Sequence, residues 1–263
     1  MSTSVVGCLR VDRSFRSALC AALVGLLAAL SSVREAQAQQ NLFNMPSGDI
    51  TPEGVVFFQE QFNFASLGES NTTFDFGLGQ GREIGFNLLN VELYDSRSPS
   101  LEPANEQAAP GLLFNAQQGF EFGELFNLEV GTQAGFNPAK NSHDVRFLNF
   151  SWITTAVDAP GEWGKGFFGV YYANRPHRGD GSAFGYMLGV DVPIVKEKLH
   201  FMADYLSGTS DLSVAVVGGV IYLPGKWQLS LGGQIPSPGS DNSYGAVMEL
   251  TQTDLLGFHA GRW

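Results

Sequence analysis

The sequence predicts an all-β protein, an up-and-down antiparallel transmembrane β-barrel of about twelve strands. Apolar and polar residues alternate with a period of two in segment after segment, which is typical of strands with two unlike faces. A secretory signal precedes these segments. A twelve-stranded barrel is too wide for its own side chains to fill, so we expect the polar face to line a wet lumen and the apolar face to contact lipid.

Residues 1–38 are predicted to be a cleaved signal peptide. Arg10, Arg13 and Arg16 precede an apolar run from Ala18 to Leu30, and the small residues of Ala36–Ala38 follow it. This order of basic, apolar and small-residue regions is typical of secretory signals. The apolar run is shorter than the roughly 20 residues that a transmembrane helix needs.

Charge and cysteine content narrow the function classes further. Both cysteines, Cys8 and Cys20, lie in the predicted signal, so the mature chain is expected to hold neither a disulfide nor a cysteine metal site. It keeps 11 basic and 24 acidic residues, a net charge of −13. An acidic chain of this kind repels nucleic acid, so we expect no nucleic-acid partner.

Twelve alternating segments follow, separated by clusters of Gly, Asp, Asn and Pro. The expected strands are Val55–Phe64, Asn71–Gly79, Glu83–Tyr94, Gly111–Phe122, Leu125–Asn137, His143–Thr155, Trp163–Arg175, Gly181–Val192, Lys198–Ser207, Asp211–Leu223, Lys226–Gln234 and Tyr244–Leu256. Mostly tight turns alternate with longer connections, as in a barrel with turns at one end and loops at the other. The barrel domain therefore covers residues 55–263, with both termini periplasmic.

Residues 39–54 form a lead segment that is rich in Pro and Gly and has no strand pattern. Asn44 to Pro52 could fold into the lumen as a plug or tether the first strand in the periplasm. We favour the periplasmic tether.

Each strand's two faces are assigned from its alternation. The lipid face is expected to carry Phe58, Phe62, Phe64, Phe74, Phe76, Leu78, Phe126, Leu128, Val130, Leu148, Phe150, Trp152, Phe184, Tyr186, Leu188 and Val190. The lumen face is expected to carry Gln59, Gln61, Asn63, Asp75, Asn87, Asn115, Gln117, Glu121, Asn127, Glu129, Gln133, Asn149, Ser151, Asp191, Asp204, Gln228, Ser230, Gln234 and Glu249. The basic candidates inside are Arg146, Lys165 and His200.

Two places break this alternation. Glu60 would face lipid, where a charge is costly except near the interface. The segment from Leu88 to Leu93 changes phase halfway, which a β-bulge would repair.

The mature chain resembles porin-like outer-membrane β-barrel proteins as a class. Its terminal Trp263 resembles the C-terminal aromatic residue that barrel-assembly machinery recognises in that class. The resemblance implies the outer membrane of a Gram-negative bacterium, with membrane lipid and the assembly machinery as partners.

Twelve-stranded barrels of known type include a phospholipase, so an enzyme is weighed beside a channel. Ser142, His143 and Asp144 are triad residue types, but adjacent residues on a strand end point to opposite faces and cannot form a catalytic chain. The loop around His177 carries two arginines, which disfavours a metal site. No catalytic residue, metal ligand or cofactor is assigned.

The leading prediction is a channel for passive passage of small polar solutes. The lumen carboxylates outnumber the basic candidates, which favours cations. The expected solute-lining residues are Gln61, Asp75, Gln117, Glu121, Asn127, Glu129, Gln133, Asp191, Asp204 and Glu249. A phospholipase-like barrel and a closed structural or adhesive barrel remain the alternatives.

Overall fold

The computed structural model describes residues 41–96, 109–123, 125–138, 145–161 and 163–256. Its strands are β1 (Val56–Phe64), β2 (Leu67–Gly79), β3 (Arg82–Asp95), β4 (Gly111–Phe122), β5 (Phe126–Phe136), β6 (Phe147–Asp158), β7 (Lys165–Ala173), β8 (Phe184–Val195), β9 (Leu199–Leu206), β10 (Val214–Leu223), β11 (Trp227–Pro236) and β12 (Gly245–Gln252). The short helix α2 (Arg175–Arg178) lies between β7 and β8.

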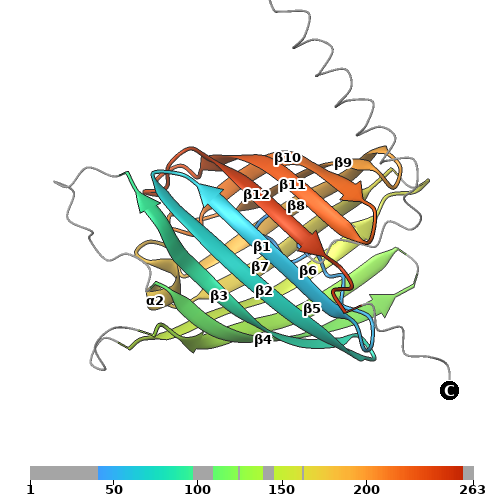
Figure 1. Ribbon diagram of the computed structural model, residues 1–263, viewed down its shortest axis with the longest axis horizontal. Coiled ribbons are helices and arrows are strands. Elements are labelled where there is room, and N and C mark those ends of the chain that lie inside the picture. Colours follow the sequence, from blue (N-terminus) through green and yellow to red (C-terminus); the bar gives the residue numbers. More distant parts are fainter. Residues whose placement is uncertain (1–40, 97–108, 124, 139–144, 162, 257–263) are drawn as a thin grey trace, which may run out of the picture.

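The strands form one closed barrel in sequence order (Figure 1). Each strand pairs antiparallel with the next, and β1 closes the barrel against β12. This confirms the predicted all-β, up-and-down antiparallel barrel and its strand number. The second strand begins at Leu67, four residues earlier than predicted, and the last strand ends at Gln252.

The two ends of the barrel differ in their connections. The turns that follow β2, β4, β6, β8 and β10 lie at one end, together with the start of β1 and the end of β12, since Phe58 pairs with Gln252. We call this the turn end. The longer connections, including the one that holds α2, lie at the opposite end, the loop end, as does the two-residue connection between β1 and β2.

The register agrees with the predicted faces in most strands. Exposed aromatic and aliphatic side chains such as Phe76, Val130, Leu188 and Leu231 point outward. The phase change in β3 is repaired as expected: Asn90 has a positive φ of 55°, and the pairing of β2 with β3 shifts between Ser70 and Thr72. A β-bulge at this point keeps apolar residues outside on both sides of it.

Glu60 does point outward, and the structure gives it a partner. It lies opposite Thr72 on β2, whose hydroxyl donates a hydrogen bond of 2.6 Å to the carboxylate. This hydrogen bond offsets part of the cost of holding a carboxylate on an apolar face.

The predicted faces of β6 are wrong. Phe150 and Trp152 point into the barrel and are 5% and 7% exposed, and Leu148 is also buried there. Asn149 and Ser151 point outward instead. They join Thr132 of β5 in a hydrogen-bonded cluster, with 2.8 Å between the Thr132 and Ser151 hydroxyls and 3.1 Å between Asn149 Nδ2 and Thr132 Oγ1.

The reversal has a physical cause inside the barrel. Residues 41–54 lie in the lumen and not outside it, so the expected tether is wrong and this segment is a plug. Leu42, Phe43 and Met45 are 0–2% exposed and pack against one side of the inner wall. The inner face of the wall is apolar on that side. In these strands, apolar side chains alone therefore do not show which face of the strand meets lipid and which faces the lumen.

Polar contacts fix the plug along its length. The Asp204 carboxylate of β9 accepts hydrogen bonds from the backbone N–H groups of Asn44 and Met45, the latter at 2.9 Å. Glu83 of β3 accepts from the backbone N–H of Thr51 at 2.6 Å. These bonds satisfy backbone donors that burial would otherwise leave without water.

An ion pair holds the plug near the turn end. Lys165 of β7 lies 3.2 Å from Asp49 and 4.0 Å from Asp158. Burial raises the pKa of Asp49, and the nearby Lys165 ammonium partly offsets that shift. The plug therefore closes the turn-end half of the lumen.

None of the helices in the described residues has the length and apolar character needed to cross a membrane.

Replacing Phe43 with Ala should weaken docking of the plug by about 3–5 kcal/mol, because the change empties a fully buried site. Hydrogen exchange at the amides of Asn44 and Met45 should accelerate while the barrel strands stay protected. Phe64→Ala, on the outer face of β1, is the matched control and should leave these amides protected. Equal protection in Phe43→Ala and the unmodified protein would contradict this account of the plug.

Candidate functional site

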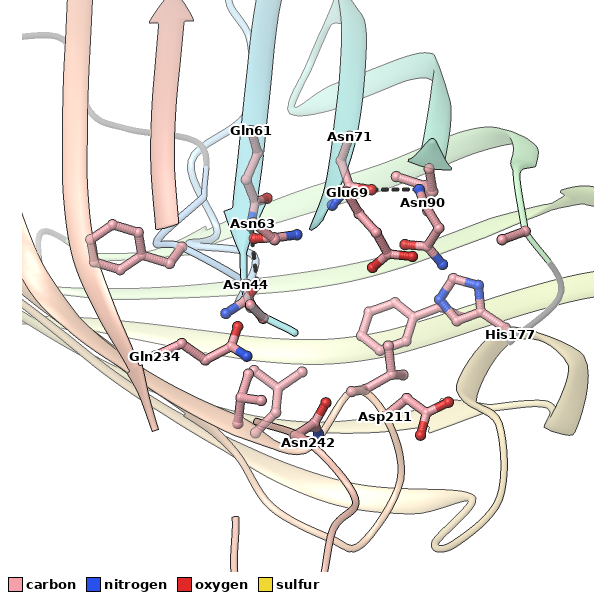
Figure 2. Close-up of a pocket in the computed structure, with 18 of the residues that line it drawn as sticks. Asn44, Gln61, Asn63, Glu69, Asn71, Asn90, His177, Asp211, Gln234 and Asn242 are labelled. Carbon is pink, nitrogen blue, oxygen red and sulfur yellow. Dashed lines mark hydrogen bonds between the residues drawn. The ribbon is translucent and has the colours of Figure 1, made fainter. Parts of the chain in front are cut away.

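A cavity of about 1160 Å³ lies between the plug and the loop end (Figure 2). Its floor is formed by Asn41, Phe43, Asn44 and Pro46 of the plug. Its mouth includes residues of the loop-end connections, among them Asp180, Asp241 and Asn242. The plug closes the cavity below, so a solute would reach it from the loop end.

One wall of the cavity is built from side-chain amides on β1 to β5. These side chains are Gln59, Gln61, Asn63, Asn71, Asn87, Asn115, Gln117 and Gln133. Many bond to one another across strands: Asn87 Nδ2 donates to Gln133 Oε1 at 2.8 Å, and Asn115 Nδ2 donates to Asp75 Oδ1 at 2.6 Å. Such bonds hold the amides in fixed orientations along the wall.

The facing wall is apolar and comes from β6, β9, β10 and the plug. Phe150, Trp152, Leu206 and Val214 line the cavity there together with Phe43. Trp152 is itself oriented, because its indole N–H donates to Glu129 Oε1 at 2.5 Å. The inner surface thus has two unlike sides.

His177 of α2 lies at the mouth and is 6% exposed. The sequence folds a helical turn here because Asn174 caps it, accepting a hydrogen bond from the His177 backbone N–H, and Pro occupies its first turn. The imidazole packs against Phe150 with ring centroids 5.8 Å apart. Burial lowers its pKa to about 4, so His177 is neutral at pH 7.

Charge in the cavity lining is one-sided. Seven of the described residues that line it are acidic, and none is Lys or Arg. The seven acidic residues are Glu69, Asp75, Glu92, Asp95, Asp180, Asp211 and Asp241. Arg175, which is not in the lining, pairs with Asp180 at 2.8 Å and balances that carboxylate.

The structure separates the ten predicted solute-lining residues into groups. Gln61, Asp75, Gln117 and Gln133 line the cavity as expected. Glu129, Asp204 and Glu249 point inward but are fully buried below or beside the plug, where Asp204 and Glu129 serve as hydrogen-bond acceptors.

The other three predicted residues lie elsewhere in the barrel. Asn127 points inward near the turn end, opposite Glu121, which is exposed at the end of β4. The Asp191 carboxylate accepts a hydrogen bond of 2.7 Å from His200 Nδ1, and the His200 ring packs edge-on to Tyr222. Of the basic candidates, Lys165 binds Asp49 and Arg146 is exposed before β6.

Sequence reasoning missed the acidic residues at the mouth. Glu69 lies before the predicted start of its strand, and Asp180, Asp211 and Asp241 lie at strand ends or in connections. The enrichment of Asp in these loop-end connections is the signal that could have revealed them.

His200 contacts Asp191 and Tyr222, while His177 contacts Phe150. Ser142, His143 and Asp144 lie outside the described residues, as do the predicted signal and Trp263. The residues described also contain no group of three or more potential metal ligands.

The chain matches no known protein-family model, and no curated protein resembles it in sequence.

Lowering the pH from 6.5 to 4 should loosen the α2 connection. The folded state binds a proton at His177 less readily than the unfolded chain, so stability is lost as pH falls through this window, by about 3 kcal/mol in full. The protection factors of the amides at positions 177 and 178, which compare the exchange rate with the intrinsic rate at the same pH, measure the effect. In His177→Phe these protection factors should not change with pH. A pH response of equal size in that variant would assign the effect to another group.

Proposed function

We propose that this barrel is an outer-membrane channel that admits small polar solutes, with a preference for cations. The observation that carries the proposal is the cavity itself, which holds seven acidic side chains and no Lys or Arg among its described lining residues. A solute enters from the loop end and reaches the plug.

The outer surface supports the membrane location. Large apolar side chains stand exposed around the barrel, for example Phe114 at 70% and Phe184 at 71%. Monomeric soluble proteins rarely expose apolar surface on this scale. The predicted signal at residues 1–38 and the closed barrel agree with export to the outer membrane of a Gram-negative bacterium.

Passage across the barrel requires the plug to move. Its docking combines three buried apolar side chains with the hydrogen bonds to Asp204 and Glu83 and the pair between Asp49 and Lys165. The proposal is therefore a channel with a low resting conductance that rises when the plug is loosened.

The cavity lining gives the cation preference a specific test. Glu92 and Asp241 lie at the mouth, away from the contacts that dock the plug. Glu60, on the outer face of β1, provides a matched carboxylate outside the lumen.

In planar bilayers with the plug loosened by Phe43→Ala, the reversal potential across a KCl gradient should show cation preference, since focused fixed charges favour counterions. Adding Glu92→Gln and Asp241→Asn should weaken that preference, while adding Glu60→Gln should not. The preference should also fade as salt rises. Anion preference, or no conductance even with the plug loosened, would refute the proposed function.

Cell fractionation tests the location independently. The protein should sediment with the outer membrane, and its mobility on a gel should change on boiling, because a closed barrel resists detergent unfolding until heated. Recovery as a soluble periplasmic protein whose mobility ignores boiling would be incompatible with the proposal.

A further inference from the structure

The two walls of the cavity face one another across the lumen. Strands six places apart in a closed twelve-stranded barrel lie on opposite sides, so β6 faces β12 and β7 faces β1. Phe150 and Trp152 of β6 therefore stand across the lumen from the amides of β1. Figure 2 shows this gap, with Gln61, Asn63 and Asn71 on one side and His177 and Asp211 on the other.

A solute that fits this space must have two unlike sides. A uniformly polar solute would leave the aromatic wall without an apolar partner, and a uniformly apolar one would leave fixed amides without hydrogen bonds. The cavity therefore favours a molecule with an apolar, preferably flat, face and a polar edge.

The amide wall supplies one donor that has no acceptor. Gln59 is 4% exposed, and its Nε2 atom is buried with no hydrogen-bond partner among the described residues. This atom is an N–H donor, so a hydroxyl or carbonyl oxygen on the solute satisfies it at little cost.

The mouth sets the sign of the solute's charge. Glu92 lies directly opposite Glu69 in the pairing of β3 with β2, and both line the cavity. The Glu92 carboxylate attracts an ammonium group by charge. His177, which also lines the cavity, stays neutral at pH 7 and adds no positive charge.

We propose that the cavity binds amphipathic organic cations that combine an apolar ring, an oxygen at one end and an ammonium group at the other. This inference rests on the proposed function and specifies its substrate class. The ring packs on Phe150, the oxygen accepts from Gln59, and the ammonium lies near Glu92.

Three probes of similar size test the inference on the full protein in detergent. Tyramine has the ring, the hydroxyl and the ammonium; 3-(4-hydroxyphenyl)propionate replaces the cation with a carboxylate; glucose keeps only the hydroxyls. Isothermal titration should show tyramine binding at least about tenfold more tightly than either of the others. Equal or tighter binding of the propionate or of glucose would overturn the inference.

Matched variants locate the site. Phe150→Leu should weaken tyramine binding severalfold, while Phe168→Leu, on the outer face of β7, should leave it unchanged. Glu92→Gln should weaken tyramine but not glucose, and Glu121→Gln should change neither. Gel mobility before and after boiling verifies that each variant forms a barrel. Loss of binding in the two control variants, or none in Phe150→Leu and Glu92→Gln, would place the site elsewhere.

The binding experiment and the channel experiment fail separately. Tyramine binding without conductance would refute the proposed passage of solutes and support the proposed class of ligand. Cation-selective conductance without preferential tyramine binding would keep the channel and overturn the substrate class.

Discussion

The width of a twelve-stranded barrel is the constraint on which the rest of this structure depends. Side chains from the wall fill the interior of a barrel of about eight strands, and a wider barrel needs something else inside. Here residues 41–54 supply that material in the turn-end half, with Leu42, Phe43 and Met45 as the packed side chains. The loop-end half is left hollow and becomes the cavity.

Because the plug fills only part of the lumen, the inner wall has two parts of different chemical character. Where the plug packs, the wall offers apolar partners such as Met187, Met202 and Val216, all fully buried. Away from the apolar side chains of the plug, the wall carries amides that bond to one another across β1 to β5. The two-sided character of the cavity is thus a consequence of how the plug is docked. It is also what gives the cavity a chemical preference.

Much of the fold could be predicted from the sequence, because period-two alternation identifies strands whatever lies on either side of them. The faces were recovered where one side was clearly polar, as in β8, where Tyr186 and Leu188 point outward and Asp191 inward. In β6 the prediction was reversed, because Phe150 and Trp152 meet a packed interior that no local pattern reveals. The plug was weighed as an alternative but the tether was favoured, since the three apolar residues of the plug lie in an irregular segment rich in Pro and Gly.

The candidate site was only partly predicted, because the pattern of a strand shows its faces but not what packs against them. Alternation places a carboxylate on the inner face but does not say whether the fold uses it. Asp204, Glu83 and Glu129 lie where protein donors reach them, and their oxygens accept from the plug or from Trp152. Glu92 and Asp241 lie farther toward the loop end, in the lining of the hollow half. Depth therefore decides role: carboxylates beside the plug hold it in place, and those at the mouth set the field that an entering solute meets.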